Sequence, residues 1–150
     1  MKFTGERFIV GQAVGDIVVE HLQRYQAAAS LVQGKTVLDA ACGEGYGSFI
    51  LSEHAASVTG IDISEQAVAY AAQKYQRGNL QYRCASIEAL PAADQSVDVV
   101  VSFETIEHVT AELQRTFLQE IKRVLKPGGL LIMSSPDKQV YSDIRNFNNV

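Results

Sequence analysis

Three glycines at alternate positions form the first group of residues that could do chemistry. They are Gly43, Gly45 and Gly47. A short apolar run precedes them and an apolar helical pattern follows. Glycines in such a loop let the backbone turn tightly and approach a ligand that side chains would otherwise block. The amide groups at the start of the following helix would also face the loop. The spacing therefore predicts a strand, a loop and a helix that cradle a nucleotide-type cofactor.

Two carboxylates extend this candidate cofactor site. Asp39 precedes the glycines, and Asp62 follows them by about 20 residues at the end of a second apolar run, where a carboxylate can accept hydrogen bonds from both hydroxyls of a ribose. A nicotinamide dinucleotide is the alternative cofactor, but its fingerprint has a glycine where this chain has Ser48. The loop therefore disfavours a dehydrogenase. Of the remaining loop residues, we expect Cys42 to be packed and Glu44 to be solvated.

Glu104, Glu107 and His108 form the second group. If this segment turns helically, positions i, i+3 and i+4 share one face. Two carboxylates and an imidazole could bind a divalent cation such as Mg²⁺ or Mn²⁺, which would lower the pKa of a bound hydroxyl and orient it. Two other interpretations stay open, namely His108 as a metal-free general base and a purely structural turn. Glu107 and His108 are the candidate catalytic residues.

Alternating strands and helices must position both groups. Apolar runs predict strands at 35–40, 56–63, 80–85, 97–103 and 130–134. Helical patterns lie between them, at 13–33, at 47–55, from Ser64 to Gly78, and from Thr110 to the Lys-Pro-Gly-Gly segment that starts at 126. This alternation predicts βαβ units and a mostly parallel sheet. Ligands of such sheets bind beyond the carboxyl ends of the strands, where both groups of residues fall.

Composition excludes several classes of function. A chain of 150 residues with 47% hydrophobic residues can bury one core, so we expect a single domain. The net charge of −4 and the scattered basic residues argue against general nucleic-acid binding. No apolar run predicts a membrane span or a signal peptide. Two cysteines without metal-site spacing predict reduced thiols, and a cytoplasmic protein is the simplest interpretation.

The chain divides into two predicted parts. Residues 1–34 are expected to form an N-terminal arm and a covering helix, and residues 35–150 the cofactor-binding core. Near the end of the sequence, Ile144 and Phe147 have little structure to bury against. We therefore expect the chain to be a fragment of a longer one, with further sequence or domains beyond residue 150.

Five motifs in collinear order resemble those of the class I S-adenosylmethionine (SAM) dependent methyltransferases. They are VLDAACGEGYG at 37–47, GIDIS at 60–64, EALP at 88–91, VDVVVSFETIEHV at 97–109 and LKPGGLL at 125–131. The resemblance implies an α/β, Rossmann-like, doubly wound sheet with strand order 3-2-1-4-5, here without the last two strands of the full fold. It also implies SAM as the cofactor.

The resemblance also implies which residues hold SAM. The glycine loop would hold the methionine moiety, braced by Asp39, and Asp62 would take the ribose hydroxyls. Ile63 and Ile87 would sandwich the adenine. The implied set is Asp39, Ala40, Gly43, Gly45, Asp62, Ile63, Ser86, Ile87 and Phe103. Many relatives carry an acid where Ser86 stands, so the contact with the adenine amino group falls here to a hydroxyl, the backbone or water.

Two further resemblances concern the acceptor. The Glu-x-x-Glu-His pattern at 104–108 is similar to that of metal-dependent O-methyltransferases that act on catechol-type quinone precursors or on the terminal ribose of small RNAs. The segment 3–8, with His21, Arg24 and Tyr25, resembles methyltransferase domains of bacterial glycan biosynthesis. The sequence therefore predicts O-methylation of a sugar or another small hydroxylated acceptor. The alternatives are a nicotinamide-dependent oxidoreductase and a non-catalytic SAM-binding regulatory domain.

Overall fold

The computed structural model describes residues 16–103, 105 and 108–134. The predicted N-terminal arm, which precedes the helical pattern at 13–33, and the predicted site residues Glu104 and Glu107 lie outside this range. The elements in chain order are α1 (Asp16–Ala29), β1 (Thr36–Ala40), α2 (Tyr46–Ser52), β2 (Ser57–Asp62), α3 (Glu65–Lys74), β3 (Leu80–Cys84), β4 (Val97–Phe103), α4 (Ala111–Val124) and β5 (Leu125–Ser134).

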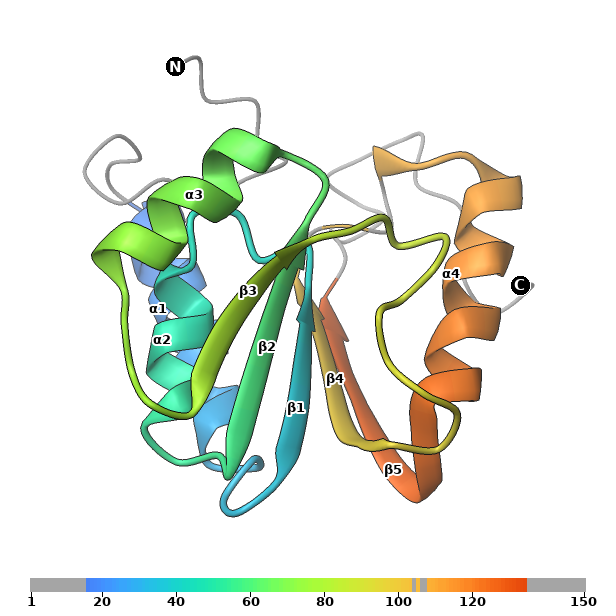
Figure 1. The fold of residues 1–150 in the computed structure, drawn as a ribbon, viewed down its shortest axis with the longest axis horizontal. Coiled ribbons are helices and arrows are strands. Elements are labelled where there is room, and N and C mark those ends of the chain that lie inside the picture. The colour runs from blue at the N-terminus through green and yellow to red at the C-terminus, as the bar shows by residue number, and fades with distance from the viewer. Residues whose placement is uncertain (1–15, 104, 106–107, 135–150) are drawn as a thin grey trace.

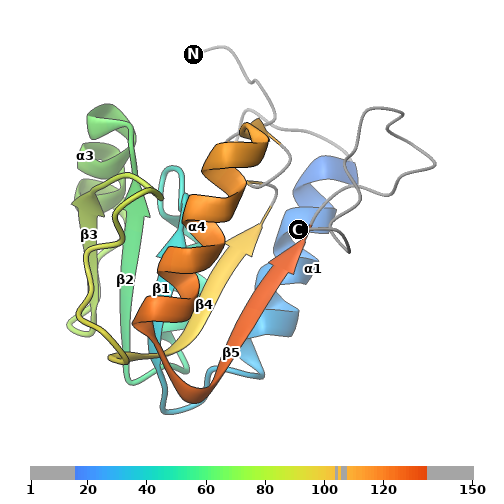
Figure 2. The same cartoon turned by 90° about the vertical axis from the view of Figure 1, so that its right-hand side faces the viewer.

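Five parallel strands form one sheet in the order β3-β2-β1-β4-β5. Helices α1, α2 and α3 cover one face and α4 covers the other, as Figures 1 and 2 show from two directions. The predicted α/β doubly wound fold and its strand order are confirmed. The carboxyl ends of all five strands therefore lie along one edge of the sheet.

Each face of the sheet has its own apolar core. Successive residues of a strand point to opposite faces, so Val37 faces α1 and α2 whereas Leu38 faces α4. Strands β1 and β4 are buried on both faces, which explains their near-continuous apolar runs. The α4 core includes Leu38, Ile61, Leu90, Val100, Phe117 and Ile121.

Two helices end earlier than their apolar patterns suggest. Helix α1 ends at Ala29, where the hydroxyl of Ser30 donates to the carbonyl of Ala27 at 2.7 Å. Helix α3 ends at Lys74 because Tyr75 is extended, with φ −117° and ψ 93°. The sequence predicts that these helices end at Gly34 and Gly78, and both predicted ends were therefore wrong by a few residues. Local hydrogen bonding and backbone conformation fix the ends, and an apolar period does not encode them.

Strand β5 begins at Leu125, although the sequence predicts a start at residue 130. Leu125 pairs with Val97 and Leu130 with Val99, so the strand carries extra residues opposite β4. Gly128, with φ +81°, makes the turn that accommodates them. The Pro-Gly-Gly segment at 127–129 therefore forms a bulge within β5, between the paired residues Leu125 and Leu130.

None of the helices in the described part of the chain has the length and hydrophobicity to cross a membrane.

Candidate functional site at the carboxyl ends of the strands

Asp62, the last residue of β2, holds the glycine loop in place. Its Oδ2 accepts a hydrogen bond from the amide of Gly43 at 3.0 Å, and its Oδ1 accepts one from the amide of Ser64 at 2.9 Å. The Ser64 hydroxyl in turn caps α3 by accepting from the amide of Ala67 at 3.1 Å. Each carboxylate oxygen keeps a lone pair for another donor. The structure therefore brings the two predicted residues Gly43 and Asp62 together and leaves acceptor capacity on the acid.

The backbone of the loop packs closely against neighbouring elements. Gly43 and Gly45 have φ of +59° and +90°, which side chains rarely adopt. A Cβ on Gly45 would lie 2.5 Å from the Cβ of Ala71 in α3 and 2.8 Å from the ring of Tyr82 in β3. The Tyr82 hydroxyl also donates to the carbonyl of Gly45 at 3.2 Å. The glycine spacing is thus required by close packing as well as by the turn.

Asp39 is a fully buried carboxylate behind the loop. The hydroxyl of Ser48 donates to its Oδ2 at 2.7 Å, and the hydroxyl of Tyr25 lies 3.3 Å from each of its oxygens. The ring of Tyr25 packs edge-on against Phe103, with centroids 4.8 Å apart. These contacts join α1, β1, α2 and the end of β4. Asp39 is therefore bound by side chains of two helices, one of which directly follows the loop, and its role in bracing the loop stays a prediction.

Sequence patterns alone did not predict that Tyr25 and Ser48 bind Asp39. Tyr25 was predicted as an apolar position of a helix and as part of the resemblance to glycan-biosynthesis methyltransferases, and Ser48 as a departure from a dinucleotide fingerprint. In the structure both hydroxyls bind Asp39. The available signal was a phenol on an otherwise apolar helix face, because a buried tyrosine hydroxyl usually needs a partner.

Burial raises the pKa of Asp39 to about 7, against the hydrogen bonds from Ser48 and Tyr25, which lower it. The folded state thus binds this proton more tightly than the unfolded chain does. Its contribution to stability is fully present at low pH and is lost as pH rises from about 4 to about 7.

The Asp39→Asn variant should lack this loss of stability, because it has no carboxyl proton at residue 39. Between pH 5 and pH 8, the difference in pH dependence between the two proteins should be about 2 to 3 kcal/mol in unfolding free energy, because part of the loss already occurs below pH 5. Urea denaturation of both proteins at pH 5 and pH 8 measures it. Contributions from all other groups cancel in the comparison, so an identical pH dependence would contradict a buried, titrating Asp39.

The residues predicted to hold adenine share the same edge of the sheet. Ile63 follows β2 and is 72% exposed, whereas Ile87 is half-buried against the α4 core. The hydroxyl oxygen of Ser86 accepts from the amide of Glu88 at 3.1 Å and keeps its own proton for donation. The amide of Ala85 donates to the carbonyl of Asp62 at 3.1 Å, which holds the start of this loop beside β2. Contact with adenine stays a prediction.

Ala40 and Phe103 end the two central strands of the sheet. Ala40 is fully buried on the α4 side, and Phe103 is buried on the α1 side against Tyr25. Both lie at the edge where the cofactor is predicted. Their packing accounts for these residues without a ligand, so their cofactor contacts stay predictions.

The second predicted group is only partly described. Glu104 and Glu107 lie outside the described residues, whereas His108 is exposed and its amide donates to the carbonyl of Thr105 at 3.1 Å. The chain therefore turns here just beyond the end of β4. Within residues 16–103, 105 and 108–134, no group of three or more His, Cys, Asp or Glu side chains could hold a metal ion. The predicted metal site needs Glu104 and Glu107, which lie outside the described residues, and it stays a prediction.

Glu44 corrects one expectation about the loop. It was predicted to be solvated, but it is only 5% exposed, and Cys42 is packed as expected. Glycines with positive φ flank Glu44 on both sides and turn the chain sharply there. A charged residue between such turns need not point outward, so residue type alone misjudged its exposure.

Comparison with known proteins agrees with this arrangement. The methyltransferase domain family matches residues 38–133. A protein named "Probable S-adenosylmethionine-dependent methyltransferase" from Mycolicibacterium smegmatis is 38% identical over 147 residues, which cover 97% of this chain and 56% of that protein. The ubiquinone biosynthesis O-methyltransferase of Coxiella burnetii is 38% identical over 106 residues, covering 69% of this chain and 44% of that one.

A solved structure shows the same fold. A chain in the Haloferax volcanii complex between the Trm112 methyltransferase activator and a methyltransferase superposes with a TM-score of 0.71 at 27% identity, covering 85% of this chain and 58% of that chain. This chain therefore belongs to the methyltransferase domain family. Its fold and relatives are those of the class I SAM-dependent methyltransferases. The chain spans about half the length of the curated relatives that it matches.

Proposed function

We propose that this chain is the cofactor-binding core of a SAM-dependent methyltransferase that methylates a hydroxyl oxygen of a sugar or another small hydroxylated acceptor. The observation that carries the proposal is the hydrogen bond between Asp62 and the amide of Gly43. It ties the acid that would bind a ribose to the glycine loop that would cradle the methionine moiety.

The residues at this edge fit the chemical parts of SAM. Asp62 has unused acceptor capacity for ribose hydroxyls, and the exposed Ile63 offers an apolar surface beside it for a purine ring. The loop turns at Gly43 and Gly45, which have positive φ and carry no side chain that could block a ligand. When bound, SAM supplies a methyl group on a positively charged sulfur, which a hydroxyl oxygen can accept in line.

His108 is the proposed base for the acceptor hydroxyl. It lies just past the end of β4, on the edge that carries the cofactor residues, and it is exposed. Its imidazole would take the hydroxyl proton as the oxygen attacks. Alternatively, His108 would bind a divalent cation together with Glu104 and Glu107, and the cation rather than a free imidazole would hold vicinal hydroxyls and activate one of them. The similarity to an O-methyltransferase of Coxiella burnetii supports oxygen as the acceptor atom.

The structure offers no support for the dehydrogenase alternative. Ser48 stands where a dinucleotide fingerprint has its last glycine, and its buried hydroxyl is bound to Asp39 at 2.7 Å.

The test of the proposed function is transfer of a labelled methyl group from SAM to diol-bearing sugars by the full-length protein. Binding of SAM without transfer to any hydroxylated acceptor would instead indicate a regulatory domain.

Metal assistance makes a separate prediction. Chelation by EDTA should abolish methyl transfer, and Glu107→Ala should lower kcat on the order of 100-fold or more while binding S-adenosylhomocysteine (SAH) normally. Glu112→Ala is a matched control, because this exposed glutamate lies nearby in the first turn of α4. Transfer that persists with chelator would exclude the metal and leave His108 as the base.

A further inference from the structure

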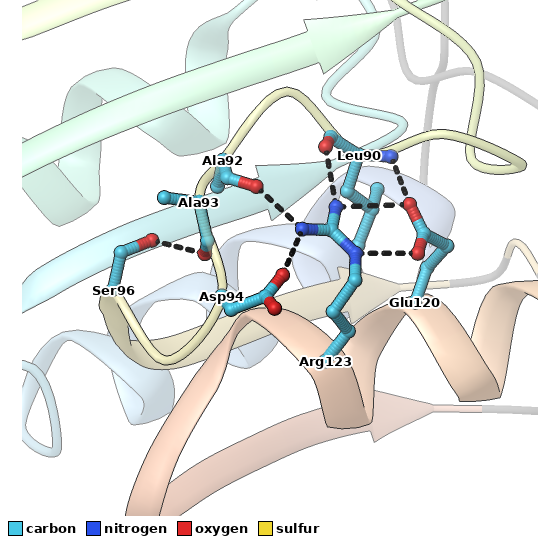
Figure 3. Close-up of polar contacts among 7 residues, drawn as sticks. All are labelled: Leu90, Ala92, Ala93, Asp94, Ser96, Glu120 and Arg123. Atoms are coloured by element: carbon cyan, nitrogen blue, oxygen red, sulfur yellow. Dashed lines mark hydrogen bonds and ion pairs between the residues drawn. The ribbon is translucent and has the colours of Figure 1, made fainter.

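Two charged residues of α4 hold the loop between β3 and β4 (Figure 3). Arg123 and Glu120 form a two-pronged pair, with Nε donating to Oε2 at 2.7 Å and Nη2 donating to Oε1 at 3.0 Å. Glu120 also accepts from the amide of Leu90 at 2.9 Å. The two side chains therefore bind each other, and Glu120 also binds the loop.

The guanidinium of Arg123 binds the loop at three more points. Nη2 donates to the carbonyl of Leu90 at 3.0 Å, and Nη1 donates to the carbonyl of Ala92 and to Oδ1 of Asp94, both at 2.9 Å. With the two bonds to Glu120, all five N–H donors of the guanidinium are used. A lysine at residue 123 would keep the charge but could not reproduce this fork. The contact is therefore specific to arginine.

This clamp fixes a loop that has little structure of its own. Residues 85–96 form no helix or strand. Leu90 is 3% exposed in the α4 core, and both of its backbone polar groups are bound by the pair. The amide of Ala89 donates to the carbonyl of Ser86 at 3.2 Å, so the anchored part is bonded to the part predicted to meet adenine. Hydrogen bonds and the chain itself therefore connect Ser86 to an anchor in α4.

We propose that Arg123 and Glu120 are positioning residues that set the affinity and selectivity of the site for the adenine end of the cofactor. The inference rests on the proposed function, because it requires the adenine of SAM to lie at Ser86 and Ile87. Neither charged residue is assigned a contact with the cofactor. They act through the loop, at Leu90 and Ala92.

A role in loop position fits the electrostatics better than a role in global stability. The Arg123 and Glu120 side chains are 34% and 18% exposed, and ion pairs so close to solvent contribute little to unfolding free energy. The hydrogen bond from Arg123 holds the pKa of Glu120 below its usual range, so the pair stays charged at neutral pH. The main expected consequence of breaking it is a looser loop.

Three variants and one control test the proposal in the full-length protein. Arg123→Lys keeps the charge and removes the fork, Arg123→Ala removes both, and Glu120→Gln keeps the shape of the partner. Lys126→Ala is the control, because it breaks another ion pair close by in sequence, the 3.2 Å contact with Asp98 in β4, which includes no residue of the loop at 85–96.

Two readouts follow the loop and the ligand separately. Hydrogen exchange should accelerate at the amides of 86–92 in the Arg123 variants, with residues 43–47 unchanged. Calorimetry should show SAH binding weakened by about tenfold, the effect of one or two lost hydrogen bonds. The preference for SAH over S-inosylhomocysteine, which has oxygen in place of the adenine amino group, should also fall. Glu120→Gln should show the same effects to a smaller degree, and Lys126→Ala none.

Two results would overturn the assignment. One is unchanged exchange at 86–92 and unchanged SAH affinity in Arg123→Ala. The other is faster exchange throughout the chain with equal loss of both nucleosides, which a general structural role would produce. Failure of the proposed function looks different, because the unmodified protein would then bind neither nucleoside. That result would remove the cofactor role, whatever the exchange shows.

Discussion

The Gly47→Ala variant is expected to lose about 3 kcal/mol or more of unfolding free energy, because the new methyl group has no space. A Cβ on Gly47 would overlap the ring of Tyr25. The ring cannot easily move aside, since it is buried against Phe103 and its hydroxyl is bound to Asp39. Alanine in a helix is otherwise favoured over glycine by up to about 1 kcal/mol. The cost of the overlap exceeds this gain in helix propensity, so the net effect of Gly47→Ala is destabilising.

Urea denaturation measures this loss, and another glycine provides the control. A Cβ on Gly78 would meet no atom within 4 Å, so Gly78→Ala should change the unfolding free energy little. Adding Tyr25→Leu to Gly47→Ala should cost less than the sum of the two single changes, because the smaller side chain relieves the overlap. Equal stability of the Gly47 and Gly78 variants would show that the Tyr25 ring does not restrict the loop.

Asp62→Ala is expected to weaken SAH binding about 100-fold in the full-length protein. Two charge-assisted hydrogen bonds to the ribose would be lost, at about 1.5 kcal/mol or more each, and each 1.4 kcal/mol is tenfold in Kd. The variant also loses the hydrogen bonds to the amides of Gly43 and Ser64, and this loss releases the glycine loop. Both effects act in the same direction on affinity.

Asp98 offers a matched carboxylate for comparison. Its Oδ2 also accepts a backbone amide, that of Thr36 at 2.8 Å, but it lies near the start of β4 at the opposite edge of the sheet. Asp98→Asn should therefore bind SAH with normal affinity, whatever its stability. If the Asp62 and Asp98 variants bound SAH equally well, Asp62 would have no part in the cofactor site.

The fold could be predicted from the sequence because its signals are local and strong. The apolar run of β4 and the amphipathic pattern of α4, with Phe117 and Ile121 on one face, allow few other elements. The order of the strands in the sheet has no local sequence signal, so its prediction came from the resemblance that the five motifs carry. The start of β5 was missed because pairing of Leu125 with Val97 depends on β4, which no local pattern shows.

The candidate site was predictable where a motif implied a contact. Asp62 and Gly43 were paired through their spacing, and the structure joins them by a hydrogen bond. Arg123 and Glu120 were not found, because an arginine near a helix end looks like a solvated charge that complements the helix dipole. Its partners Leu90 and Ala92 lie in an irregular loop and offer backbone carbonyls, which have no sequence signature.

Calorimetric titration of SAH and, separately, of NADH into the full-length protein tests the central claim most directly. The proposed cofactor site predicts saturable binding of SAH with one site per chain and no comparable binding of NADH. Such binding would show that the protein accepts the demethylated product of SAM. Binding of NADH in preference to SAH, or no binding of SAH, would contradict the proposed function.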